Sequence, residues 1–290
     1  MELFSAIKCG YLAFEETVLG QTGEVIGNTS HGTFIRTSNN RIVFLSSEKY
    51  SNPLNINLLP FPSVLRDLQV HDHVNLGNGK VIFPRLDFQV STSSQIVYKS
   101  MPAPQIRREP VMIRENILAI ITEINRLITP EGFASLLPAY LNEDKSNAKE
   151  SKQLAVLQDI HGYLQTQSVK ELRLSLSRHI GSGRGLTPAG DDLICGFLLL
   201  LNRWEMGKFR GDQLNELNLE LSKEAYKRTT TLSANLIELA SHGEGDERLI
   251  TVLDSIYGAD PSPQEAAKLL LSYGSSSGLD AFTGMVIAIN

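Results

Sequence analysis

The chain has 290 residues, of which 42% are hydrophobic and 20% charged, as is typical of a globular protein of about two domains. Its 27 basic and 32 acidic residues give a net charge of −5, which argues against a nucleic-acid partner. The apolar run from Leu193 to Leu201 is far short of the ~20 residues that span a bilayer, and the first residues lack the features of a secretory signal. We therefore expect a cytoplasmic protein without a membrane partner, with Cys9 and Cys195 as buried free thiols.

Residues 1–100 are predicted to form a β-rich domain that resembles a barrel or a sandwich. Asn39-Asn40 separates two β-rich runs, which predicts a hairpin, and Gly77-Asn78-Gly79 is a second predicted turn. About six or seven short strands are expected in all. His71 and His73 have the spacing to lie on one strand face as a metal pair, although no third ligand is evident.

Residues 101–110, MPAPQIRREP, contain three prolines and predict a linker. Apolar residues then recur at helical spacing, so residues 111–290 are expected to form a mostly helical domain, and the fold class is α+β. A helix is expected to begin near Pro130, followed by a polar loop at 142–151. Further helices are predicted at about 152–178, 188–206, 212–241, 245–257 and 262–273, with a last one from about 279. Residues 172–180 also alternate with period two, but their helical neighbours favour a helix.

The segment GSGRGLTPAGDD at 181–192 precedes the apolar run and has an unusual composition. One interpretation is a simple helix start, with Thr187 as the N-cap, Pro188 as the first helical residue, and Asp191 and Asp192 in the first turn. The alternative is a ligand site, because glycines let the backbone approach a ligand and helix N-termini bind anions. Arg184 would then pair with a phosphate or carboxylate.

Known phosphate-binding motifs do not match this segment. A P-loop requires a lysine that is missing here, and the dinucleotide fingerprint requires glycine where Leu186 stands. Two carboxylates beside an anion would repel it, so they would either hold a divalent cation or accept hydrogen bonds from an amide or amine of the ligand.

The C-terminal segment GSSSGLDAFTGMVIAIN at 274–290 repeats the same arrangement of a small-residue loop, Gly-Leu, an aspartate and a glycine-containing apolar helix. Gly196 and Gly284 would permit close contact between the two helices, at a cost in helix propensity of ~1 kcal/mol each. We therefore predict that the two elements pair in space and form one site. Convergence of two short low-complexity loops is the alternative.

A third segment, KRTTTLSANLIELASHGEGDE at 227–247, places hydroxyl residues inside a helical pattern. Thr229, Thr230, Thr231 and Ser233 would line the same pocket, or would simply bond to backbone carbonyls. Among the histidines, His179 is nearest to the glycine loop and is the candidate acid or base, although a polar residue at a helix end is the simpler interpretation. His31, His161 and His242 are expected to lie on the surface.

These motifs resemble the bacterial AllH family, which is assigned as a subunit of an oxamate carbamoyltransferase. The family pattern G-x-G-x-G-L-T-P-x-G-D-D is met at 181–192, R-T-T-x-x-S at 228–233, and S-S-G-x-D-x-x-x-G at 276–284. The resemblance covers the C-terminal half. It implies partners related to FdrA, an acyl-CoA-synthetase-like protein, together with a second subunit encoded nearby. It also implies carbamoyl phosphate, or a small carboxylate such as oxamate, as the ligand.

The function expected from these observations is a subunit of a carbamoyltransferase-type enzyme that binds a phosphate- or carboxylate-bearing ligand at glycine-rich helix N-termini. A metal hydrolase built on the Asp191–Asp192 pair, with Mg²⁺ as its candidate cofactor, and a non-catalytic scaffold that docks FdrA-like partners are the alternatives. The candidate catalytic residues are Asp191, Asp192 and His179. The candidate ligand-binding residues are Gly183, Arg184, Gly185, Thr187, Gly190, Arg228, Thr229, Thr230, Ser233, Ser276, Ser277, Gly278 and Asp280.

Overall fold

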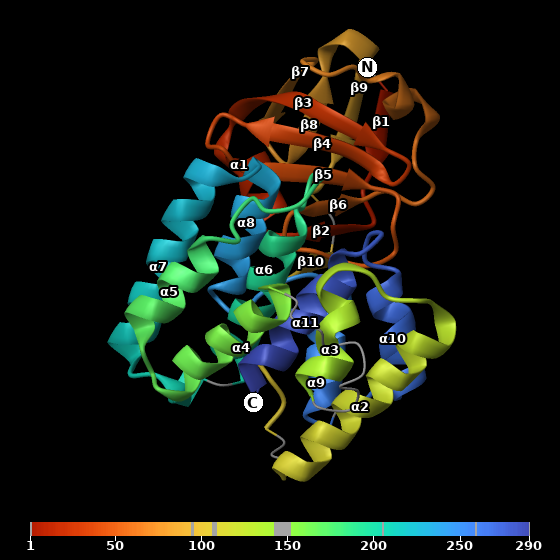
Figure 1. Ribbon diagram of the computed structural model, residues 1–290. Coiled ribbons are helices and arrows are strands. Elements are labelled where there is room, and N and C mark those ends of the chain that lie inside the picture. The colour runs from red at the N-terminus through yellow and green to blue at the C-terminus, as the bar shows by residue number, and fades with distance from the viewer. Residues whose placement is uncertain are drawn as a thin grey trace. The chain divides into compact units, whose positions relative to one another are not determined.

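The computed structural model of the chain describes residues 2–93, 96–105, 109–141, 152–204, 206–258 and 260–289 (Figure 1). The chain forms two compact units, Met1–Met101 and Pro102–Asn290. The predicted α+β class is confirmed, because a curled sheet occupies the first unit and helices occupy the second. The polar loop expected at 142–151 lies outside the described residues.

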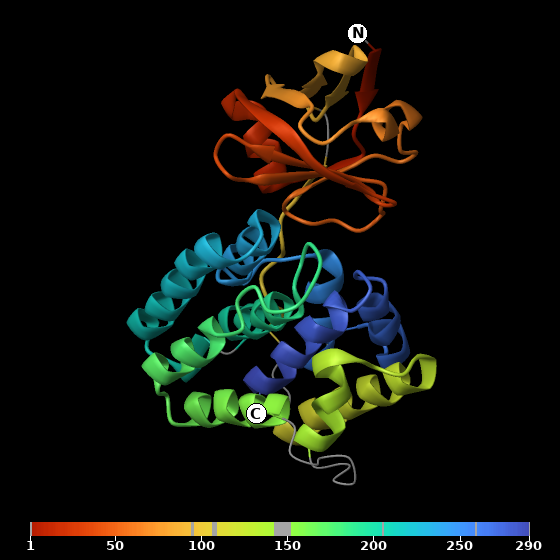
Figure 2. The same cartoon turned by 45° about the horizontal axis from the view of Figure 1, so that its top comes forward.

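The first unit contains a ten-stranded sheet in the order β1-β9-β8-β7-β3-β4-β5-β6-β2-β10 (Figures 1 and 2). Its strands are β1 Glu2–Ser5, β2 Lys8–Gly10, β3 Gln21–Thr29, β4 Gly32–Thr37, β5 Ile42–Ser46, β6 Asn55–Asn57, β7 His73–Gly77, β8 Lys80–Phe83, β9 Phe88–Ser91 and β10 Ile96–Tyr98. Strand β1 pairs in parallel with β9 at one end of the strand order, and β2 pairs in parallel with β10 at the other end. The sheet therefore curls into a half-barrel around an apolar core.

The two predicted hairpins are present. Asn39-Asn40 lies between antiparallel strands β4 and β5, and Gly77-Asn78-Gly79 joins antiparallel strands β7 and β8. The unit also contains a helix that the sequence analysis did not predict, α1 Tyr11–Leu19, and two short 3-10 turns, Ser63–Asp67 and Pro84–Leu86. Helix α1 ends at Gly20, whose left-handed φ of 72° stops the helix.

The second unit is helical over its described residues. Its elements are α2 Pro110–Leu127, η3 Gly132–Leu136, α3 Leu137–Tyr140, α4 Lys152–Gln165, α5 Val169–Ser177, α6 Ala189–Arg203, η4 Met206–Lys208, α7 Gly211–Arg228, α8 Thr231–Ala240, α9 Glu247–Ile256, α10 Pro263–Leu271 and α11 Ser277–Ile289. Among these helices, none is long and apolar enough to cross a membrane.

Two of the predicted helices are each divided in two. The helix expected at 152–178 stops before Gln167, which has a positive φ of 53°, and resumes as α5. The helix expected at 212–241 breaks at Thr229, where the backbone becomes extended, and Thr230 then caps α8 through its hydroxyl, which accepts from the Ser233 N–H at 3.1 Å. The helical spacing of apolar residues continues through both breaks, so the periodic pattern did not reveal them.

Helices α6 and α11 form the centre of this unit and lie side by side in both views (Figures 1 and 2). Every residue of α6 from Gly190 to Leu201 is buried, as is every residue of α11 from Gly278 to Ala288. A Cβ at Gly196 would overlap the backbone of α11 at Ala281, and a Cβ at Gly284 would overlap the backbone of α6. The predicted close contact of these two glycines is therefore confirmed, and it brings both helix starts to the same end of the pair.

Candidate functional site

The segments 181–192 and 276–280 meet where α6 and α11 begin. The hydroxyls of Thr187 and Ser277, which are 90 residues apart in sequence, share a hydrogen bond of 3.0 Å. Thr187 therefore does not cap α6 as expected. The N-cap is Pro188, which carries no side-chain cap bond, and helix geometry begins at Ala189, one residue later than predicted. Asp191 and Asp192 do lie in the first turn.

The glycine loop is held in a conformation that other residues rarely adopt. Gly183 has a φ of 126°, and a Cβ at this position would lie 2.6 Å from the backbone nitrogen of Ala189. The loop residues Gly183, Arg184 and Gly185 are exposed, whereas Gly190 is buried against the backbone oxygen of His179. The backbone of residues 183–185 is therefore accessible to a ligand, while the buried Gly190 fixes the end of the loop.

Asp191 joins three segments of the chain. Its Oδ1 accepts a hydrogen bond from the Gly181 N–H at 2.7 Å, and its Oδ2 accepts one from the hydroxyl of Thr229, at the break between α7 and α8. Burial raises the pKa of Asp191, and these hydrogen bonds act in the opposite direction. Because both oxygens have donors, Asp191 fits the role of a residue that positions the glycine loop.

The neighbouring hydroxyls also fasten this loop. The hydroxyl of Thr230 donates to the Leu186 carbonyl at 2.6 Å, and the hydroxyl of Ser233 lies 3.4 Å from the same oxygen. Of the residues predicted to line the pocket, Thr229, Thr230 and Ser233 are therefore brought to the site, where their hydroxyls hold the loop in place.

Asp192 faces the other way, towards α11. Its carboxyl group accepts hydrogen bonds from the hydroxyls of Ser277 and Thr187, yet its Oδ2 is buried and has no partner among the described residues. Burial raises the pKa of Asp192 well above its ordinary value, and the charges of Asp280 and Asp191 raise it further. This carboxyl group therefore retains its proton at a pH where an exposed aspartate is ionised.

Asp280 is the counterpart of Asp192 on α11. Its carboxyl group accepts from the hydroxyl of Ser276 and the backbone N–H of Phe133, but its Oδ1 is buried and lacks a partner within the described part of the chain. Burial raises the pKa of Asp280 to about 6. The site thus contains two buried carboxyl oxygens without donors, one from each helix start.

The charged and titratable residues proposed around the loop have different surroundings. Arg184 is exposed and, within the described residues, makes no hydrogen bond or ion pair. The guanidinium group of Arg228 donates to the Ser177 carbonyl at 2.7 Å and pairs with Glu224 at 3.5 Å, so it is held against α5 and α7. His179 is half-buried, its ring packs edge-on against Phe133, and burial lowers its pKa.

The remaining predicted residues of α11 are close to the site. Ser276 is exposed and bonds Asp280, as described above, and Gly278 packs so tightly against α10 that a Cβ would overlap the Leu270 carbonyl. Gly278 is thus buried, and its place against Leu270 indicates a packing role. His161 was expected on the surface, but this was wrong: it is half-buried beside Tyr140, and burial lowers its pKa.

The metal-site hypothesis rested on Asp191 and Asp192. Among the described residues, no group of three or more His, Cys, Asp or Glu side chains is placed to hold a metal ion. Both oxygens of Asp191 are already used by protein donors, so the Asp191–Asp192 pair does not offer Mg²⁺ two free carboxylates. His71 and His73, whose spacing suggested a pair on one strand, do not both belong to it, because His71 precedes β7 with a positive φ of 73° and approaches Glu24.

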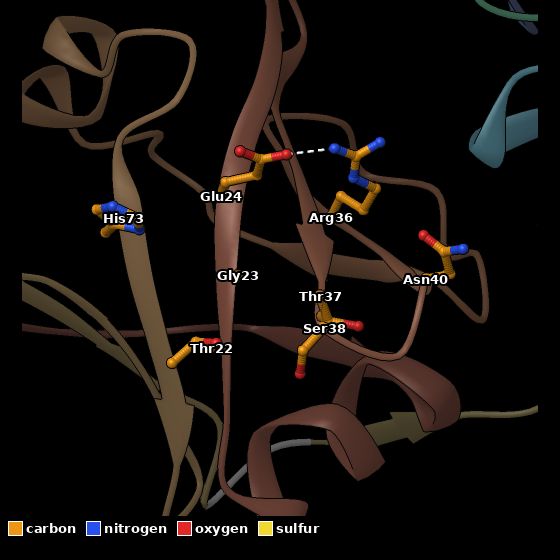
Figure 3. A pocket seen from close by; sticks show the side chains of 8 residues that line it. All are labelled: Thr22, Gly23, Glu24, Arg36, Thr37, Ser38, Asn40 and His73. Carbon is orange, nitrogen blue, oxygen red and sulfur yellow. Dashed lines mark hydrogen bonds and ion pairs between the residues drawn. The ribbon is translucent and has the colours of Figure 1, made fainter.

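The first unit carries a polar pocket of about 350 Å³ that the sequence analysis did not identify (Figure 3). It lies over strands β3, β4 and β7, where the Arg36 guanidinium pairs with the Glu24 carboxylate and holds the pKa of that group below its ordinary value. Its lining residues are Thr22, Gly23, Glu24, Arg36, Thr37, Ser38, Asn40 and His73. The pocket is shallow and most of its side chains are solvated.

Comparison with known proteins supports the motif analysis. No curated protein and no solved structure matches the chain. Residues 179–289 match the family model described as "Oxamate carbamoyltransferase subunit AllH". The matched segment extends from the residues just after α5 to the end of α11, so it contains the glycine loop, Thr229–Ser233 and the start of α11. The predicted resemblance is thereby confirmed: residues 179–289 are similar to the AllH family, whose name is that of a carbamoyltransferase subunit.

Proposed function

We propose that the chain is a substrate-binding subunit of a carbamoyltransferase-type enzyme, and that its ligand binds where α6 and α11 begin. The observation that carries this proposal is the hydrogen bond between Thr187 and Ser277, which joins the two glycine-rich loops inside the segment that matches the AllH family. A subunit of this type acts with other subunits, and FdrA-like proteins are the partners that we propose.

The anionic end of the ligand would bind at the exposed glycine loop. Backbone N–H groups and the positive ends of the α6 and α11 dipoles favour a phosphate or carboxylate here, and Arg184 has no other partner among the described residues. The buried carboxyl groups would repel an anion only when ionised. Because burial and its neighbours raise the pKa of Asp192, its uncharged form persists to a higher pH than that of an exposed aspartate, which reduces the repulsion.

Carbamoyl transfer requires little covalent chemistry from such a site. When oxamate is the acceptor, its amide nitrogen attacks the carbamoyl carbon, the bond to the phosphate oxygen breaks, and a base removes one amide proton. In the reverse direction, phosphate attacks the carbamoyl carbon and the amide nitrogen regains the proton. Oriented donors would stabilise the charge on the carbonyl oxygen. His179, whose lowered pKa keeps it neutral, is the candidate base.

The proposal is tested by calorimetry on the full chain with phosphate, carbamoyl phosphate and oxamate, each with and without Mg²⁺. A double variant, Thr187→Val with Ser277→Ala, removes the bridge between the loops and is expected to weaken binding by about tenfold, as the loss of one or two hydrogen bonds implies. Thr122→Val is the matched control, because its hydroxyl bonds only the Leu118 carbonyl on the exposed face of α2. Absence of binding to all three ligands by the unmodified chain would contradict the proposal.

A further inference from the structure

We infer that Asp192 and Asp280 together recognise a primary amide or carbamoyl NH₂ group, and so select the ligand by its nitrogen. This inference rests on the proposed function, since it concerns the same site. It assigns the amide end of the ligand to the two carboxyl groups between the helix starts, and leaves the anionic end to the loop around Arg184.

The first support is the state of the two carboxyl groups. Asp192 is 3% exposed and Asp280 is 1% exposed, and each carboxyl group has hydrogen-bonding neighbours within the protein. Yet one oxygen of each, Asp192 Oδ2 and Asp280 Oδ1, is buried with no partner in the described structure. A buried acceptor without a donor is unfavourable, and native proteins rarely leave one unexplained. Two such atoms on facing helix starts call for a group with two donors.

The second support is the contrast with Asp191. This residue is adjacent in sequence and equally buried, at 1% exposed, yet both of its oxygens have protein donors. Burial in this region therefore does not by itself leave carboxyl oxygens without partners. Among the three aspartates at the two helix starts, the oxygens without a partner in the described structure belong to Asp192 and Asp280.

The two carboxyl oxygens without protein donors, Asp192 Oδ2 and Asp280 Oδ1, indicate the class of ligand. An NH₂ group of an amide or carbamoyl compound offers two N–H donors and no acceptor, which matches two acceptor oxygens. A cation is disfavoured, because the positive ends of two helix dipoles converge on the same place. A methyl group of equal size would leave both oxygens unsatisfied, so a site of this kind rejects an analogue that lacks the donors.

The test compares ligand pairs that exchange NH₂ for CH₃ at equal charge. These are oxamate against pyruvate and carbamoyl phosphate against acetyl phosphate, with dissociation constants measured by calorimetry on the full chain. The unmodified chain is expected to prefer the NH₂ compound of each pair by at least about tenfold. Asp192→Asn and Asp280→Asn place an amide donor opposite the NH₂ group, and each is expected to reduce this preference to within about threefold.

Asp191→Asn is the matched control for these variants. Because both oxygens of Asp191 already have protein donors, its replacement is expected to weaken the binding of both ligands of a pair alike and to leave the ratio of their dissociation constants unchanged. Folding of each variant is checked by the fluorescence of Trp204, the single tryptophan, which stacks on Tyr257 in the same unit.

The outcomes separate this inference from the proposed function. If no ligand binds the unmodified chain, the proposed function fails and this inference fails with it. If the ligands bind but the two members of each pair bind equally, only the inference is overturned. The inference is also overturned if the preference persists in folded Asp192→Asn and Asp280→Asn proteins, because another group would then recognise the NH₂ group.

Discussion

The raised pKa of Asp280 predicts that Asp280→Asn changes how stability depends on pH. Burial raises this pKa from its ordinary value of 3.8 to about 6 in the folded protein. The folded state therefore holds the proton more tightly than the unfolded state, so stability falls as the pH rises from 3.8 to about 6 and the loss is complete above that range. A tenfold change in proton affinity is worth about 1.4 kcal/mol, so the full loss is about 3 kcal/mol.

The asparagine variant lacks this proton equilibrium and keeps an oxygen for Ser276 and the Phe133 N–H. Relative to the unmodified chain, its free energy of unfolding is expected to rise by up to about 3 kcal/mol between pH 4 and pH 7.5. The assay is urea denaturation at several pH values, followed by the fluorescence of Trp204, whose indole N–H bonds Asp254 inside the helical unit. Asp191 titrates in both proteins, so its contribution largely cancels, whereas loss of the Asp280 charge lowers the pKa of Asp192 and so acts in the same direction as the loss of the Asp280 titration. A stability difference that stays constant from pH 4 to pH 7.5 would refute the reasoning.

Three further substitutions separate packing, positioning and binding. Gly196→Ala places a methyl group into the backbone of α11 and is expected to destabilise the helical unit by about 3 kcal/mol in urea denaturation. Gly162→Ala is the control, because a Cβ there meets open space on α4, and it is expected to stabilise the unit by up to ~1 kcal/mol. Equal effects of the two variants would contradict the packing argument. Thr229→Val removes one donor from a buried carboxylate and is expected to cost about 1–3 kcal/mol, measured in the same way, and a neutral effect would show that the bond is dispensable. Arg184→Ala is expected to change stability by less than ~0.5 kcal/mol while weakening phosphate binding several-fold in calorimetry, and unchanged binding would remove Arg184 from the site.

Much of the architecture could be predicted because local signals agreed with the final structure. The turn residues between β4 and β5 and between β7 and β8 specified hairpins whose partners are adjacent in sequence. The three-residue strands β2, β6 and β10 could not be predicted, because they are too short to show alternation and owe their conformation to pairing with distant strands. The break at Thr229 was hidden for a similar reason: apolar spacing stays in phase across it, and the reason for the break is a contact with Asp191.

The same distinction applies to the candidate site. The repeated loop-to-helix pattern and the two internal glycines were sufficient to predict that α6 and α11 pack together, since each glycine carries a propensity cost that only close packing explains. The role of Thr187 was not visible in the sequence. An N-cap is the usual role of a threonine before a helix, and nothing local showed that its hydroxyl would bond Ser277 instead.

The two adjacent aspartates show why a local pattern left the chemistry open. Consecutive residues of a helix point about 100° apart, so Asp191 and Asp192 cannot face the same neighbours even though both benefit from the helix dipole. Asp191 points towards the break between α7 and α8, where Thr229 supplies a donor. Asp192 points towards the start of α11, where one of its carboxyl oxygens has no donor. The pair is therefore better understood as two separate groups, one that positions the loop and one that faces the ligand, than as a single metal-binding unit. A cation held by the pair would need free oxygens on both carboxylates, and both oxygens of Asp191 already accept hydrogen bonds from the protein.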